Sequence, residues 1–214
     1  MTVETVIVAM AAALAENWGI GYQQNLPWHI PADSEYLEIV TSKAYSSSTE
    51  SNNDDYTNIV IMGRLSWESI PMQKIPMKRR FNIVISRDLS YNVHERQYFP
   101  NASLANSLKD AIAQATKLAE KTRGRIFILG GGQIYEQAIA ECTHILLTKI
   151  HSSKKISCDA FMKPVDEQLF TLAPHDELEA FVEQTMPRGR QVLGDLEYEF
   201  LLFKRKVHAA DTEF

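Results

Sequence analysis

Cysteine is scarce in this sequence: Cys142 and Cys158 are the only two thiols among 214 residues. They are too few and too irregularly spaced for a disulfide framework or a zinc site, which favours a reducing compartment, the cytoplasm. The six histidines show no metal-ligand spacing either, so we expect no metal. No Ser-His-Asp or Cys-His arrangement is recognisable, and the sequence therefore gives no support to covalent catalysis.

Long apolar runs and an excess of positive charge are also missing. No window approaches the length of a membrane span. The apolar start of the chain lacks a basic leading region and carries Glu4, so we expect a buried strand there rather than a signal peptide. The formal net charge of −5 argues against a nucleic-acid binder. Neither a membrane nor a nucleic acid is therefore expected as a partner.

The composition that is present describes a globular chain. Hydrophobic residues make up 45% and charged residues 23% of the sequence, and its length is sufficient for a full core. We expect one domain over residues 1–206 and a flexible tail, 207–214. The stretch 42–58 has no hydrophobic period and is rich in Ser, Asn and Asp, so we interpret it as a long exposed connection inside this domain.

Strand and helix patterns alternate along the chain, which predicts an α/β fold with a mainly parallel sheet. Continuous Val and Ile runs indicate strands buried on both faces, and the last third predicts an added antiparallel hairpin. The expected strands are 3–9, 58–62, 82–86, 125–129 and 144–150, with a hairpin of 180–185 and 198–204. The expected helices are one from Pro31 to about Thr41, a short one over 64–70, one from a Ser103 cap to Thr122, and one near 133–140.

One carboxylate, Asp33, follows a Pro-Trp pair and stands at the head of an amphipathic helix pattern. Walled by Trp28, Ile30 and Leu37, it would lose part of its water, while the helix N-terminus would favour its charged form. Such a carboxylate suits a ligand that offers paired N–H donors. The alternative is a structural acidic residue that only complements the helix dipole.

A run of three glycines, residues 130–132, stands where a buried strand meets a helix. It could let backbone N–H groups approach a pyrophosphate, and a plain tight turn is the alternative. Arg64 and Arg87 each follow a strand of the expected sheet and could hold the 2′-phosphate of NADP, with Ser86 donating a hydroxyl. Taken singly, each arginine is more often a surface cation. The Rossmann fingerprint is absent, because GIGYQQN lacks its third glycine.

These motifs occur in a fixed order: GIGYQQNLPW, Asp33, IVIMGRLSWESIP, Arg80 before NIVISR, IFILGGGQIYEQA and LLTKI. In that order and spacing the chain resembles the dihydrofolate reductase family over nearly its whole length, to about Lys206. The resemblance implies a three-layer α/β/α fold around an eight-stranded mixed sheet, NADPH as hydride donor and 7,8-dihydrofolate as substrate. It also implies antifolate inhibitors as ligands and a monomer.

The resemblance implies a role for particular residues. Asp33, Thr148 and Trp28 are the expected catalytic residues: Asp33 accepts hydrogen bonds from pterin N3 and the 2-amino group, Thr148 supports that carboxylate, and Trp28 holds the substrate through water. Arg80 is expected to pair bidentately with the α-carboxylate of the glutamate tail. The expected substrate-binding residues are Met10, Ala11, Asp33, Leu37, Ser66, Ile70, Met77, Arg80, Leu129, Tyr135 and Thr148. The expected cofactor-binding residues are Ala12, Ile20, Gly21, Gly63, Arg64, Leu65, Ser66, Ser86, Arg87, Leu129, Gly131, Gly132, Gln133 and Ile134.

The reaction implied by the resemblance is hydride transfer to pterin C6 with protonation at N5. Because Asp33 cannot readily reach N5 while it holds N3, we expect it to orient the ring and raise the basicity of N5, with water delivering the proton. Two alternatives stay open: a pyrimidine reductase of riboflavin synthesis, which shares this fold and cofactor, and a non-catalytic nucleotide-binding protein. Loss of NADPH absorbance on addition of dihydrofolate separates the three.

Overall fold

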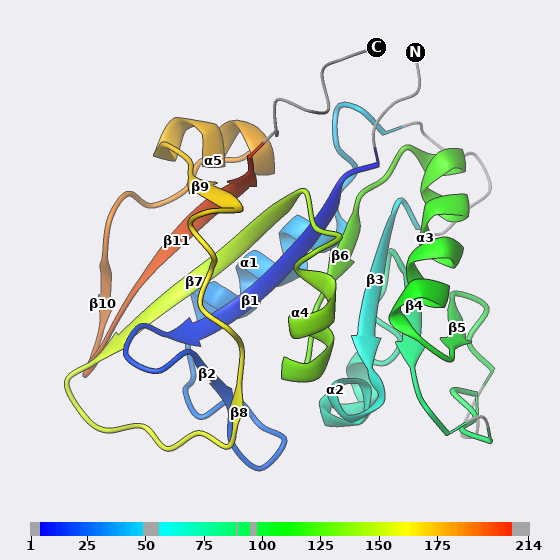
Figure 1. Ribbon diagram of the computed structural model, residues 1–214, viewed down its shortest axis with the longest axis horizontal. Helices are drawn as coiled ribbons and strands as arrows, with labels where there is room; N and C mark the ends of the chain where they lie inside the picture. Colours follow the sequence, from blue (N-terminus) through cyan, green and yellow to red (C-terminus); the bar gives the residue numbers. More distant parts are fainter. Residues whose placement is uncertain (1–4, 49–55, 89, 95–97, 207–214) are drawn as a thin grey trace.

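The computed structural model describes residues 5–48, 56–88, 90–94 and 98–206. The predicted tail, 207–214, and residues 49–55 of the polar stretch lie outside the described residues. Strands and helices alternate along the chain (Figure 1). In chain order the elements are β1 (Ile7–Leu14), β2 (Gly19–Gly21), α1 (Pro31–Ser42), β3 (Asn58–Gly63), α2 (Arg64–Ser69), η1 (Met72–Lys74), β4 (Arg80–Ile85), β5 (Ala102–Ala105), α3 (Leu108–Thr122), β6 (Ile126–Ile128), α4 (Gly132–Ala138), β7 (His144–Ser152), β8 (Ala160–Phe161), β9 (Phe170–Leu172), α5 (His175–Val182), β10 (Gln191–Leu193) and β11 (Leu196–Arg205).

Eight strands lie side by side in the main sheet, in the order β10-β11-β7-β1-β6-β3-β4-β5. The strands from β7 to β5 run parallel to one another, whereas β11 is antiparallel to β7 and pairs with β10 in a hairpin. The predicted eight-stranded, mixed and mainly parallel sheet is therefore confirmed. Two pairings were not predicted: β9 adds to β11, and β2 pairs with β8 in a small separate sheet.

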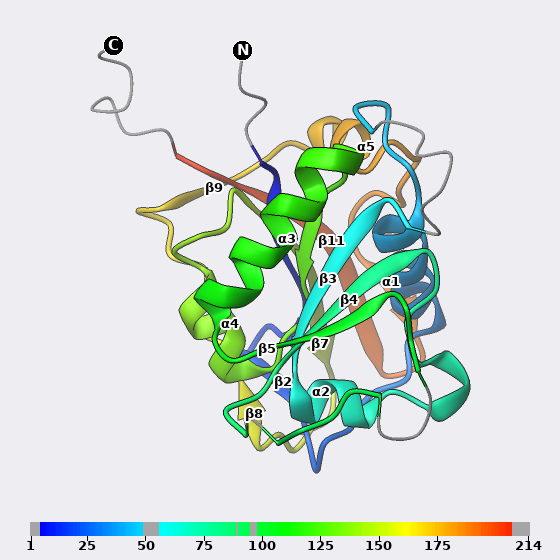
Figure 2. The same cartoon turned by 90° about the vertical axis from the view of Figure 1, so that its right-hand side faces the viewer.

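Helices cover both faces of the sheet and complete the three layers. Figure 2 shows α3 and α4 on one side of β3 and β4, with α1 on the other side. Alternation along the strands explains this arrangement, because successive side chains point to opposite faces. In β3, Ile59 and Ile61 pack in the core under α3 and α4, while Val60 and Met62 pack in the core under α1, α2 and α5. The prediction of strands buried on both faces is confirmed.

The first strand lies later in the chain than predicted. It runs from Ile7 to Leu14, beyond the predicted end at residue 9, and pairs with β7 as far as Leu14. Alanines occupy most of its second half, and alanine has a low strand propensity. The prediction therefore ended the strand soon after its last Val and Ile residues. Burial between two helical layers, not propensity, keeps Ala11 and Ala13 in the strand.

One strand of the predicted C-terminal hairpin is confirmed and the other is wrong. Residues 198–204 do lie in β11, but their hairpin partner is β10, and residues 180–182 belong to α5. In α5, Leu178 and Val182 are buried while Ala180 between them is exposed; a strand would place all three on one face, whereas a helix does not. The short apolar run fitted both periods, and packing against the sheet selects the helix.

Two further predictions are corrected. Ser103 is not a helix cap, since it lies in β5; α3 begins at Leu108, and the Ser107 hydroxyl oxygen accepts a hydrogen bond from the Asp110 N–H at 3.2 Å. The described part of the polar stretch 42–58 is not wholly exposed, because Tyr45 is buried and its ring centroid lies 3.5 Å from the Arg125 guanidinium carbon. An aromatic ring stacked on a cation holds the start of this connection against the core.

Candidate active site

Two cavities open at the carboxyl ends of the parallel strands. The first has a volume of about 610 Å³ and lies between β1, α1 and α2. The second has a volume of about 620 Å³ and lies at the ends of β3 and β4, beside the start of α3. Four residues line both cavities, so the two spaces adjoin: Leu65, Ser66, Gly131 and Gly132. This edge of an open α/β sheet is where ligands bind.

Most of the predicted site residues line one of these cavities. The first cavity is lined by Met10, Ala11, Ala12, Ile20, Gly21, Asp33, Leu37, Leu65, Ser66, Ile70, Met77, Leu129, Gly131, Gly132, Tyr135 and Thr148. The second is lined by Gly63, Arg64, Leu65, Ser66, Ser86, Arg87, Gly131, Gly132, Gln133 and Ile134. The two predicted residues outside both linings are Trp28 and Arg80.

Asp33 lies in the first turn of α1, where Pro31 starts the helix without any side-chain cap. Its carboxylate is half-buried and lines the first cavity. Burial raises the pKa of Asp33 above its ordinary value of 3.8, and a hydrogen bond with the Thr148 side chain opposes that rise. The expected preference of the helix N-terminus for a charged group is thus outweighed by loss of water.

Thr148 is placed under Asp33 by the sheet. It lies in β7, opposite Ala12 of β1 on one side and Phe200 of β11 on the other. Only 2% of Thr148 is exposed, so its hydroxyl has no access to bulk water and is held for the carboxylate. A central strand thereby fixes the orientation of a side chain that begins a helix.

Tyr135 of α4 closes the end of the first cavity beneath the glycine turn. Its hydroxyl donates to the Met10 carbonyl oxygen at 2.6 Å and its ring is buried. Gly130 has a φ of 103°, and a side chain there would overlap the Tyr135 ring. Glycine is therefore required at this turn by both the backbone conformation and the ring beside it.

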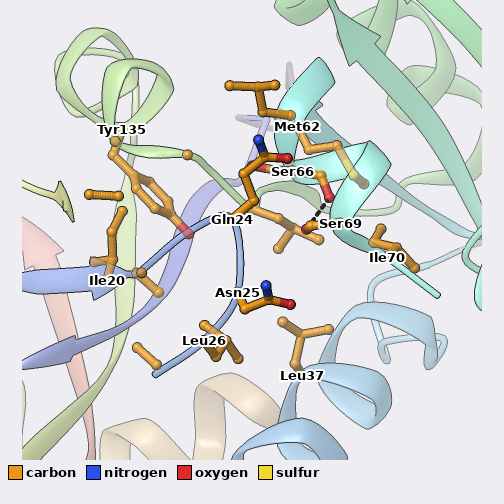
Figure 3. Close-up of a pocket in the computed structure, with 18 of the residues that line it drawn as sticks. Ile20, Gln24, Asn25, Leu26, Leu37, Met62, Ser66, Ser69, Ile70 and Tyr135 are labelled. Carbon is orange, nitrogen blue, oxygen red and sulfur yellow. Dashed lines mark hydrogen bonds between the residues drawn. The ribbon is translucent and has the colours of Figure 1, made fainter. Parts of the chain in front are cut away.

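Apolar side chains form most of the remaining wall of the first cavity. Figure 3 shows Leu37 on α1 and Ile70 just beyond α2, with Met62 and Tyr135 further round the same space. Tyr135 is the only aromatic residue among the described residues that line it. A flat ligand would therefore contact mainly aliphatic and thioether groups.

The second cavity combines cations, hydroxyls and close backbone. Arg64 pairs with Glu68 at 3.2 Å, whereas Arg87 is exposed at the end of β4. Ser86 is buried, and its hydroxyl oxygen accepts from the Asp88 N–H at 3.1 Å. This set of groups suits a phosphate-bearing ligand.

Trp28 lies in a small apolar cluster with Leu14, Ile30 and Ile150. Its indole N–H is buried and has no hydrogen-bond acceptor among the described residues. A buried donor of this kind is normally satisfied by water or a ligand. The predicted contact to substrate through water is compatible with this geometry and stays a prediction.

Arg80 is almost fully buried at the start of β4, with 1% of its surface exposed. Its guanidinium donates from Nη2 to Glu38 Oε1 at 2.7 Å, from Nη1 to the Thr41 hydroxyl at 2.8 Å, and from Nε to the Lys78 carbonyl oxygen at 2.8 Å. Burial lowers the pKa of Arg80, and Glu38 opposes that shift. Its predicted contact with a substrate carboxylate stays a prediction.

Several lining residues were missed from the sequence. In the first cavity these are Gln23, Gln24, Asn25, Leu26, Met62, Ser69, Asp159 and Ala160, and in the second Ile85, Asp88, Asn106, Ser107, Leu108 and Gln137. Asp159 reaches the site because its carboxylate accepts from the Gln23 N–H at 2.9 Å, a pairing across 136 residues that no local pattern signals. Asn106 and Ser107 were assigned to the body of a helix that begins only after them.

Comparison with known proteins agrees with this geometry. A sequence model of the dihydrofolate reductase family matches residues 6–187. The chain belongs to the dihydrofolate reductase family. The dihydrofolate reductase of Candida albicans is 32% identical over 205 residues, which cover 94% of this chain and 97% of that protein. That of Saccharomyces cerevisiae is 31% identical, also over 94% of this chain and 97% of the relative.

Some relatives are much longer than this chain. A bifunctional dihydrofolate reductase-thymidylate synthase of Glycine max is 33% identical over 164 residues, which span 29% of that protein. The match to the dihydrofolate reductase of Schizosaccharomyces pombe spans 46% of its length. The chain thus spans less than half the length of these two curated relatives.

Proposed function

We propose that this chain reduces 7,8-dihydrofolate to 5,6,7,8-tetrahydrofolate with NADPH. Asp33 is the observation that carries the proposal. It places a half-buried carboxylate, supported by Thr148, in a mainly apolar cavity that adjoins a second cavity lined by arginines. A pterin ring offers the paired N–H donors that such a carboxylate can accept.

The second cavity has the groups that NADPH would need. Arg64 and Arg87 would hold the 2′-phosphate, and Ser86 would add a hydroxyl donor. Gly132 lines the cavity and packs so closely on β8 that a side chain there would overlap the Phe161 carbonyl oxygen, so only glycine fits at this turn. When bound, NADPH supplies the hydride.

The chain itself contributes orientation, exclusion of water and charge. Asp33 accepts from pterin N3 and the 2-amino group, which fixes the ring and raises the basicity of N5; water delivers the proton there. Leu37, Ile70 and Met77 keep bulk water from the ring. Tyr135 borders the space where the two ligands meet.

Two more residues contribute to substrate binding in this proposal. Trp28 uses its unpaired indole N–H to hold the substrate through water. Arg80 binds the α-carboxylate of the glutamate tail, for which its rigid fork is suited. We also propose that antifolates occupy the first cavity and that the protein is a cytoplasmic monomer. Both cysteines are free, which agrees with a reducing compartment.

None of the helices in the described part of the chain is long and apolar enough to cross a membrane. Among the same residues no group of three or more His, Cys, Asp or Glu side chains is placed to hold a metal ion.

The test is the loss of NADPH absorbance when dihydrofolate is added to the purified chain. We expect dihydrofolate-dependent oxidation of NADPH, and much slower oxidation of NADH because it lacks the 2′-phosphate. Turnover of an aminopyrimidine substrate in place of dihydrofolate would indicate a pyrimidine reductase. Binding of NADPH without any turnover would indicate a nucleotide-binding protein.

A further inference from the structure

The ion pair between Glu38 and Arg80 joins an exposed side chain to a buried one. Arg80 is 1% exposed and is held by Thr41 and the Lys78 carbonyl as well as by Glu38. The Glu38 side chain is 59% exposed on the outer surface of α1. The arginine therefore stays in place. The glutamate is readily solvated once it leaves, but another anion must then take its place, because the buried guanidinium would otherwise lose its counter-charge.

Neither residue of the pair lines the first cavity, but close neighbours of both do. Leu37, the neighbour of Glu38, and Met77, three residues before Arg80, both line that cavity. Asn82 fixes Met77, since its side-chain oxygen accepts from the Met77 N–H at 3.0 Å and its amide donates back to the Met77 carbonyl at 3.1 Å. We infer that a ligand which fills the cavity and extends past Leu37 and Met77 approaches the Arg80–Glu38 pair.

Of the three guanidinium nitrogens of Arg80, only one donates to a carboxylate among the described residues. Nε and Nη1 are engaged by the Lys78 carbonyl and Thr41, whereas Nη2 is engaged only by Glu38. A second carboxylate on the same guanidinium would be repelled by the first. An incoming anionic group must therefore displace Glu38, or bind beside it and lose affinity through repulsion between the two negative charges.

We propose that Glu38 is an internal competitor for the anionic tail of the substrate, and so a specificity-determining residue. This inference rests on the proposed function, in which Arg80 binds the glutamate α-carboxylate. Glu38 holds the place of that carboxylate on Arg80 until the tail arrives. It lowers the affinity for pterins that carry a glutamate tail and does not act on the pterin ring itself.

The test compares two ligands in two variants. Dissociation constants are measured by quenching of tryptophan fluorescence for dihydrofolate and for 6-methyl-7,8-dihydropterin, which has no tail. In Glu38→Gln the preference for dihydrofolate over the tail-less pterin should rise about two- to fivefold, the range expected when one partly exposed charge is removed. Glu38→Ala, which also removes the competing oxygen, should raise the preference at least as much.

Glu35→Gln is the matched control. Glu35 is exposed on the same helix and the substitution removes the same charge, so it should leave the preference at the wild-type value. An unchanged or reduced preference in both Glu38 variants, or an equal rise in Glu35→Gln, would overturn the inference. Turnover by the wild-type chain distinguishes failure of the proposed function from failure of the role of Glu38. If the chain oxidises NADPH with neither pterin, the proposed function itself fails. If it reduces dihydrofolate but the Glu38 variants keep the wild-type preference between the two ligands, only the role of Glu38 fails.

Discussion

Asp33 loses water on folding, and this burial raises the pKa of its carboxyl group above 3.8. The unfolded chain releases this proton near pH 3.8 and the folded chain only at higher pH. As pH rises through that window the folded state binds more protons than the unfolded state, so stability falls, and the penalty is complete above the folded-state pKa. The residue proposed to orient the substrate is therefore one that weakens the fold.

Replacing Asp33 by Asn separates these two effects. At pH 7 we expect Asp33→Asn to unfold at a higher urea concentration than the wild-type chain, because no buried charge remains. Turnover of dihydrofolate should fall by about a hundredfold or more, as expected when a preorganised charge is removed from a reaction site, while NADPH binding is unchanged. Unfolding below pH 3.8 should show little difference between the two proteins. Unchanged turnover would remove Asp33 from the mechanism.

Thr148 sets the pH at which Asp33 acts. In Thr148→Val the hydroxyl that opposes the rise in pKa is lost, so the Asp33 pKa should rise further. The pH below which dihydrofolate binding weakens should then move upward. Titrating the dissociation constant against pH measures this shift, and Thr148→Ser, which keeps the hydroxyl, is the control. Identical profiles for Val and Ser would show that the hydroxyl does not govern the carboxylate.

Helix α1 and strand β3 show what a sequence pattern can predict. A proline at the first turn and an apolar stripe define α1, and a continuous Val/Ile run defines β3, because each signal is local and long enough to exclude other periods. Strand β5 has only four residues and stands immediately before a helix, so its pattern merged with that of α3. Helix α5 was missed for a different reason, because its short apolar run also fitted a strand.

The site likewise has residues that the sequence could predict and contacts that it could not. Asp33, Arg64 and Arg87 could be proposed because each follows a recognisable element boundary. The Asp159–Gln23 contact and the Arg80–Glu38 pair could not, since they depend on how distant segments meet. Sequence spacing predicts which strand ends lie at the same edge of the sheet. It does not predict which side chains of the site form hydrogen bonds or ion pairs with each other.

The cap of α3 gives a test at the level of the element. Ser107→Ala removes the acceptor for the Asp110 N–H and should lower the free energy of unfolding by about 1 kcal/mol. Ser107→Asp, which can accept the same hydrogen bond, should stay close to the wild-type value. Urea unfolding measures both. Equal losses in the two variants would contradict the role of Ser107 as a cap.

At the scale of the whole molecule, the two cavities lie at the edge of the sheet, beside the hydrophobic cores on its two faces. Because the ligand sites are built from the folded core, ligands should stabilise the entire chain. At about one hundred times its dissociation constant NADPH should add about 2.7 kcal/mol, which corresponds to a rise of roughly 5–10 °C in Tm for a chain of this size. A thermal scan with and without NADPH measures this. An equal rise with the same concentration of NADH would contradict the proposed role of Arg64 and Arg87.

The wall between the cavities is thin, since Leu65, Ser66, Gly131 and Gly132 line both. One molecule that joins a pterin-like ring to a nucleotide-like group could therefore occupy both spaces with a very short linker. Once its first half is bound, its second half is present at a high effective concentration, and the translational entropy of association is lost only once. The adjacency that lets two substrates react also makes this protein a suitable target for bisubstrate inhibitors.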